Sequence, residues 1–140
     1  MQRISQADYF AAYAGHPGIT SAMRGNAEVL LHAVNALLDL ALESGQVDLE
    51  INPDTGCLVS GKRDGGWRPL ECATGAPTSA HKQAMAVDVY DPDGDLDSWC
   101  MNNHHHLFRL GLYLEHPAAT RGWCHLTTRA PRSGNRVFYP

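Results

Sequence analysis

Two histidines and one aspartate have the residue types and setting of a metal site. His81 follows a stretch rich in Gly, Pro, Ser and Thr, and Asp88 lies seven residues later in an otherwise apolar segment. His125 is flanked by apolar residues in a second such segment. A buried carboxylate is costly without a partner, and a divalent cation is one such partner. Two imidazoles and one carboxylate leave a fourth tetrahedral position for water, which zinc activates near neutral pH.

A second interpretation of the same residues stays open. Asp88 could pair with an arginine in the core, and His125 could be a buried histidine that hydrogen-bonds to a carbonyl. Spacing and composition favour neither interpretation over the other.

Hydrophobic periodicity predicts the elements that would position these residues. Asn26 is a suitable N-cap for a long helix, Asp97 can cap a second one, and 52–56 has turn chemistry. The predicted order is a helix at 6–14, a helix at 26–44, a hairpin at 47–60, a loop at 61–80, a strand at 86–90, a helix at 98–109, strands at 112–114 and 123–127, and a coil tail at 130–140.

This order predicts an α+β fold with a small, mainly antiparallel sheet packed against helices. We expect a single domain over 1–140, since 140 residues is an ordinary domain size. Its parts would be a helical N-terminal segment at 1–45, a metal-site core at 46–128 and a tail at 129–140.

The motif Ser79-x-His81-x6-Asp88, followed by Trp123-x-His125, resembles the zinc D-Ala-D-Ala carboxypeptidases and endolysin peptidases of the hedgehog/DD-peptidase fold. Arg121-Gly122-Trp123-Cys124-His125 is similar to short phage and prophage members, and Ser60-Gly61-Lys62-Arg63 resembles the family's Ser-Gly-Tyr-Arg segment. The match covers roughly 57–127.

The resemblance implies a hedgehog/DD-peptidase-like fold and Zn²⁺ held by His81, Asp88 and His125. It also implies that Arg63 steadies a substrate carboxylate or the developing oxyanion, because a guanidinium offers a rigid fork of donors. Ser79 and Trp123 adjoin the ligands, and we count them as substrate-binding candidates.

The sequence departs from the family pattern at three positions, of which Lys62, in place of Tyr, is a minor one. Ala84 stands where the family has Gly, which requires a backbone that avoids positive φ. Gly122 stands three residues before His125, where one branch carries a catalytic Glu. Hydrolysis needs another acid–base group, and the candidates are His116, which we rank first, and Glu115. The alternative is that both are solvated loop residues.

The resemblance therefore predicts a zinc metallopeptidase that hydrolyses D-amino-acid-containing peptide bonds of peptidoglycan, with stem peptides as partners. It leaves carboxypeptidase and endopeptidase action open. The alternative is a non-catalytic zinc-binding module, or a phage structural protein that retains the fold, and Gly122 favours it.

The composition and the first residues of the sequence indicate which classes of partner to exclude and where we expect the protein to be found. The net charge of −4 argues against nucleic acid and anionic membranes as partners. The first residues lack a secretory signal, so we expect a protein that is cytoplasmic as synthesised and reaches the wall in a virion or at lysis. The four cysteines lack CxxC spacing, and we expect free thiols.

Overall fold

The computed structural model describes residues 3–140, and within this range four strands form one mixed sheet in the order β1-β3-β2-β4. β1 and β2 both pair antiparallel with β3, while β4 pairs parallel with β2. The strands are β1 Ala86–Asp91, β2 Tyr113–Glu115, β3 Gly122–Thr127 and β4 Val137–Phe138. The predicted α+β class is confirmed.

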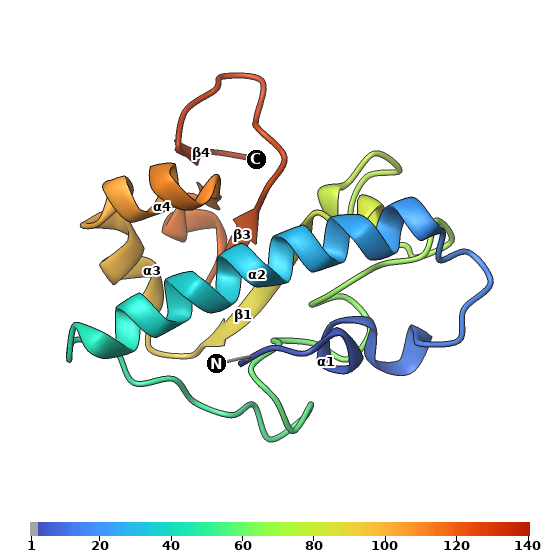
Figure 1. Ribbon diagram of the computed structural model, residues 1–140, viewed down its shortest axis with the longest axis horizontal. Helices are drawn as coiled ribbons and strands as arrows, with labels where there is room; N and C mark the ends of the chain where they lie inside the picture. The colour runs from blue at the N-terminus through green and yellow to red at the C-terminus, as the bar shows by residue number, and fades with distance from the viewer. Residues whose placement is uncertain (1–2) are drawn as a thin grey trace.

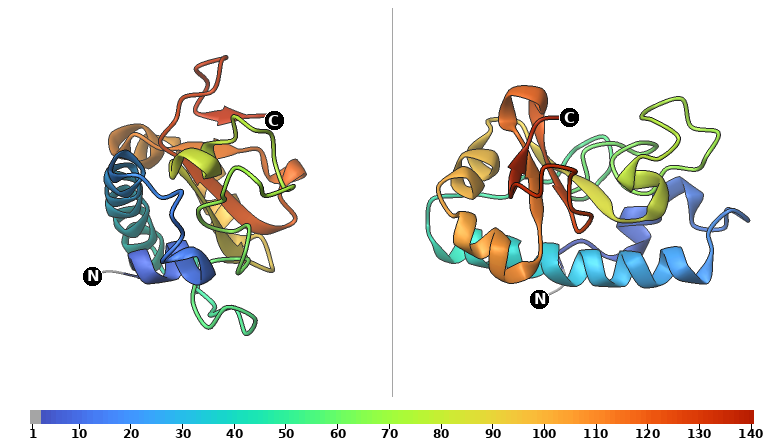
Figure 2. Two further views of the ribbon diagram at one scale, coloured as in Figure 1. Left: turned by 90° about the vertical axis from the view of Figure 1, so that its right-hand side faces the viewer. Right: turned by 90° about the horizontal axis from the view of Figure 1, so that it is seen from above.

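Helices cover one side of this sheet. The longest, α2, crosses it obliquely in Figure 1, and the end-on view of Figure 2 shows it as a separate layer. The α-helices are α1 Gln6–Phe10, α2 Ser21–Glu43, α3 Asp95–Met101 and α4 His104–Leu110, with 3₁₀ turns η1 Ala11–Tyr13, η2 Ala80–Gln83 and η3 Pro117–Ala119.

The two faces of the sheet have different chemistry because side chains alternate along each strand. The face toward α2 is apolar and belongs to one core cluster with that helix; it is formed by Val87, Val89, Leu114, Cys124 and Leu126. The opposite face carries Asp88 on β1, His125 on β3 and Glu115 on β2. The alternation that buries the core therefore gathers the ionisable side chains on the other face.

The long helix begins earlier than predicted. Thr20 is the N-cap and accepts a hydrogen bond from the Met23 amide, so α2 starts at Ser21 rather than after Asn26. Asn26 instead donates its side-chain amide to the Gln83 carbonyl and ties the helix to η2.

The predicted helix at 98–109 is two helices, because the chain breaks at Asn102 and Asn103 between α3 and α4. Asp97 does not cap α3 as predicted. The carboxylate of Asp91 accepts hydrogen bonds from the Leu96 and Asp97 amides instead. Asp91 ends β1, and the chain turns from it into α3 through Gly94, which adopts a left-handed φ of 75°.

Two further predictions are wrong. Residues 47–60 form no regular hairpin: Asn52 and Cys57 make an isolated bridge, while Ser60 donates its amide to the Asp88 carbonyl and Tyr90 donates to that of Leu58. Pairing within the segment is therefore limited to this bridge, and residues 58–60 pair with β1 instead. The tail at 130–140 is not all coil, since β4 pairs with β2.

Ala84 also differs from expectation, because it adopts the left-handed φ of 58° that its side chain was expected to avoid. A non-glycine residue in this region costs roughly 1–2 kcal/mol. The turn closes η2, where the Ala84 amide donates to the His81 carbonyl, and it leads directly into β1.

The four cysteines are free thiols, as expected, and Cys100 and Cys124 are buried. Among residues 3–140, the longest apolar helical stretch falls short of what a bilayer crossing requires.

Asp97 is a buried carboxyl group beneath the sheet's apolar face. It is 2% exposed, and its Oδ2 accepts a hydrogen bond from Thr120 Oγ1 at 3.1 Å. Burial raises the pKa of Asp97 to about 7; the nearby Asp91 carboxylate acts in the same direction, and hydrogen bonds with Cys124 and Thr120 oppose the shift.

We expect the free energy of unfolding to fall as the pH rises from about 4 to 7. The folded state binds the Asp97 proton more tightly than the unfolded chain does, so the contribution is full below the unfolded pKa and is lost through the folded pKa. Between pH 5 and 8 the loss should be about 2–3 kcal/mol. Urea unfolding of wild type and Asp97→Asn at both pH values, with a chelator present, measures it. An equal pH dependence in the two proteins would contradict this assignment.

Candidate metal centre

His81, Asp88 and His125 come together on the face of the sheet that points away from α2. Asp88 on β1 is directly opposite His125 on β3, and η2 delivers His81 to the end of β1. His125 Nδ1 lies 2.8 Å from Asp88 Oδ1, and His81 Nε2 lies 3.3 Å from the same oxygen. The three possible ligand atoms lie within 4.8 Å of one another, so the group could hold a metal ion.

The orientation of His81 is fixed by its second ring nitrogen. Nδ1 lies 2.8 Å from the Gly66 carbonyl oxygen, and because a carbonyl only accepts, Nδ1 must carry the proton. In the neutral ring, Nε2 then presents a lone pair toward Asp88 Oδ1. Two lone pairs face each other stably only if a proton or a metal cation lies between them. Histidine ligands of metals commonly have such a second hydrogen bond.

The negative charge of Asp88 is strongly stabilised although its side chain is buried, with only 8% of its surface exposed. Burial by itself would raise the pKa of this carboxyl, but the positive charge of protonated His81 and hydrogen bonds from His125 and His81 hold the pKa well below its ordinary value. Asp88 therefore stays ionised throughout the neutral range, as a metal ligand must.

Arg68 forms an ion pair with the other oxygen of Asp88. Its Nη2 lies 3.4 Å from Oδ2, its Nε donates to the Asp64 carbonyl, and its Nη1 donates to the Thr74 carbonyl. The alternative interpretation of a buried Asp–Arg pair is thus present alongside the histidine cluster. Oδ2 faces the arginine, and Oδ1 faces the two imidazoles.

Glu115 lies beside this cluster. Its Oε2 is 3.8 Å from His125 Nδ1, because β2 pairs with β3 and brings Glu115 next to His125 on the same face. Burial raises the pKa of Glu115; the positive charge of protonated His125 opposes this shift, and the negative charge of Asp88 adds to it. A carboxylate beside a metal site can act as a general acid or base.

His116 occupies a different environment from Glu115. Its Nδ1 accepts a hydrogen bond from the Ala118 amide at the start of η3, and its ring stacks on Tyr139 at 4.4 Å between centroids. Glu115 therefore lies against the cluster, whereas the contacts of His116 are with η3 and the tail.

Gly122 has a φ of 98°, which disfavours any other residue at this position. A glutamate here would be strained. The carboxylate beside the cluster comes instead from the neighbouring strand, at Glu115.

Arg63 is exposed and does not line the cleft around the cluster, whereas Arg68 does. The sequence did not single out Arg68. The signal that could have found it is its place after Gly65-Gly66-Trp67, in a loop whose tight backbone lets a long side chain reach inward.

Ser79 and Trp123 both line the cleft. Ser79 accepts a hydrogen bond from the His81 amide at the start of η2, so it also shapes the turn that presents His81. The cleft has one hollow of about 760 Å³ and another of about 420 Å³, and Trp123 borders both.

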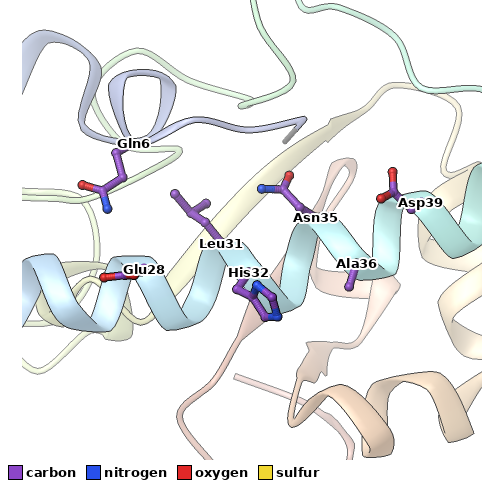
Figure 3. Close-up of a pocket in the computed structure, with 7 residues that line it drawn as sticks. All are labelled: Gln6, Glu28, Leu31, His32, Asn35, Ala36 and Asp39. Atoms are coloured by element: carbon purple, nitrogen blue, oxygen red, sulfur yellow. The ribbon is translucent and has the colours of Figure 1, made fainter. Parts of the chain in front are cut away.

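A separate hollow of about 390 Å³ lies along α2 and shares no lining residue with the cleft. Its lining includes Asn35 and Asp39, which Figure 3 shows on the side of the helix that faces the N-terminal segment. Asn35 accepts from the Arg3 and Ile4 amides, and Asp39 pairs with Arg3. These polar groups fasten the N-terminal segment to α2.

We expect Arg68→Met to destabilise the metal-free protein by about 2–4 kcal/mol, because removing one partner of a buried ion pair leaves the other charge uncompensated. Arg63→Met is the matched control and should change the free energy of unfolding by less than about 0.5 kcal/mol, as an exposed residue. Urea unfolding in the presence of a chelator compares the two. Equal effects would show that Arg68 does not compensate Asp88.

Comparisons of the chain with protein-family models, with curated proteins and with solved structures find no significant match. The geometry of the site therefore carries the functional proposal.

Proposed function

We propose that the protein is a zinc-dependent peptidase that hydrolyses D-amino-acid-containing peptide bonds in the stem peptides of bacterial peptidoglycan. The observation that carries the proposal is the convergence of His81 Nε2 and His125 Nδ1 on Asp88 Oδ1, while His81 Nδ1 is held by the Gly66 carbonyl. A divalent cation bound by these three atoms would take the place of the protons that otherwise lie between them. The choice of peptidoglycan follows from the resemblance of the His81, Asp88 and His125 motif to wall peptidases.

The donor set suits zinc. Two imidazole nitrogens and one carboxylate oxygen are typical ligands of a catalytic zinc, which keeps a fourth position for water. At bond lengths of about 2.0–2.1 Å, tetrahedral ligand atoms lie roughly 3.4 Å apart. Asp88 Oδ1 lies 3.3 Å from His81 Nε2 and 2.8 Å from His125 Nδ1, so the His125 ring would move outward by a few tenths of an ångström to admit the ion. When bound, zinc would supply a Lewis acid that acidifies water and polarises a carbonyl.

The residues of the chain supply the remaining functions. Glu115 is placed to take a proton from the attacking water at Oε2 and to return it to the nitrogen of the leaving amine. Arg68 fixes Asp88 through Nη2, and it borders the cleft where a substrate carbonyl or carboxylate would lie. Trp123 forms an apolar wall against which a peptide can pack.

The alternative of a non-catalytic zinc-binding module requires a metal site without a nearby acid–base group. The 3.8 Å between Glu115 Oε2 and His125 Nδ1 argues against that alternative, since it leaves a carboxylate within one water's reach of the site.

We expect one zinc ion per wild-type chain, and a loss of zinc affinity of more than about 100-fold in His81→Ala, because even groups that only orient a ligand account for 10–100-fold. His32→Ala is the matched control, since His32 is exposed on α2. Metal analysis after dialysis and competition with a chelator measures both. Equal zinc content in wild type and His81→Ala would overturn the metal assignment.

We expect Glu115→Gln to lower kcat on a stem peptide by about 10²–10⁴-fold with zinc content retained, because the proton-transfer group is lost while the ligands remain. His116→Gln should stay within about threefold of wild type. Release of amine from a peptide that contains D-alanine measures the rate. A large loss of kcat in His116→Gln with little change in Glu115→Gln would show that His116, and not Glu115, transfers the proton.

A further inference from the structure

The cleft extends beyond the metal cluster into two hollows. They share Arg68, Asp88 and Trp123 and so meet at Asp88, while His81 and His125 line the larger hollow. The larger hollow continues between the loop at 75–79 and the tail at 129–132. The smaller one continues past the turn at 52–54.

A peptidase that removes only a terminal residue needs a wall or a charge that receives the chain end next to the scissile bond. Here the space around the cluster continues in two directions, about 420 Å³ on one side and about 760 Å³ on the other. An extended peptide adds about 3.3 Å per residue, so hollows of this size can take several residues on each side of the reacting bond.

The larger hollow has arginines along its length and carries the carboxylates of Asp88 and Glu115 only near the metal cluster. Arg129 and Arg132 line its outer part, and Arg68 lines its inner end. Arg129 Nη1 donates a hydrogen bond to the Thr78 carbonyl at 2.7 Å, which holds this side chain across the space between the tail and the loop. Phe138 and Pro140 add apolar surface to the same hollow.

We propose that an extended peptide binds across both hollows, with a carboxylate-bearing segment beside Arg129 and Arg132. Resting on the proposed function, this binding mode makes the protein an endopeptidase that cuts within acidic peptides rather than a carboxypeptidase. Guanidinium groups favour carboxylates through paired N–H donors, and this pairing selects the segment that enters the larger hollow.

The first test uses the zinc-loaded full chain with peptides blocked at both ends by acetyl and amide groups around one D-alanine bond. One has Glu on the amino side of that bond, one has Glu on the carboxyl side, and one has Gln at both places. A fourth, with a free terminus one residue after the bond, represents a carboxypeptidase substrate. We expect internal cleavage of the blocked peptides, and a roughly three- to tenfold higher kcat/KM for one Glu peptide than for its Gln counterpart, as two exposed ion pairs supply. Cleavage of the fourth peptide alone would overturn the proposal.

The second test measures binding by calorimetry to the metal-free protein, so that it does not depend on catalysis. The double variant Arg129→Gln, Arg132→Gln should lose the preference for the Glu peptide over the Gln peptide. Arg109→Gln, which changes an exposed arginine on α4, should keep it.

The two tests separate the two proposals. If no peptide is cleaved but the Glu preference is present and depends on the arginines, the peptidase function fails while the binding mode stands. If the preference is absent, or is unchanged in the double variant, the binding mode is overturned whatever the rate of cleavage.

Discussion

The ionised carboxylate of Asp88, in the middle of a buried strand, is the constraint on which the rest of the site depends. Such a group is stable only if positive charge and hydrogen-bond donors surround it. Arg68 meets this need at Oδ2, and the imidazoles of His81 and His125 meet it at Oδ1. The loop before η2, the turn at Ala84 and the pairing of β1 with β3 all bring a compensating group to this one side chain.

The same arrangement links stability to chemistry. Arg68 joins Asp88 to the backbone of Asp64 and Thr74, so the loop over the cleft is held by the group that balances the buried charge. His81 is in turn oriented by Gly66 of that loop. Small shifts of the loop would therefore change both the position of a ligand and the compensation of the carboxylate, which favours a rigid site.

The strands and the convergence of the metal group could be predicted from the sequence, and other parts of the site could not. Alternation at 86–90 and 123–127 predicted strands with Asp88 and His125 on one face, because a period of two fixes side-chain direction. The break between α3 and α4 was missed, although the apolar residues stop at Met101 and resume only at Leu107. Alternation at 47–51 suggested a hairpin, but pattern alone does not show which strand the following segment will pair with. The path of a long loop decides that Arg68, and not Arg63, borders the cluster. The register of a three-residue strand decides that Glu115, and not His116, lies beside His125. Only tertiary packing sets these two features.

The two-residue strand β4 has a consequence for the behaviour of the chain in concentrated solution. Leu114 donates its amide to the Arg136 carbonyl and His116 donates to that of Phe138, so the outer border of β2 is already satisfied. If β4 were absent, the edge of β2 would be unpaired. An unpaired edge is a template to which a second molecule can add its own strand, which is a usual first step of aggregation. β4 covers that border with only two residues of its own, too few to recruit another chain, and so protects the sheet from self-association at the edge next to Glu115.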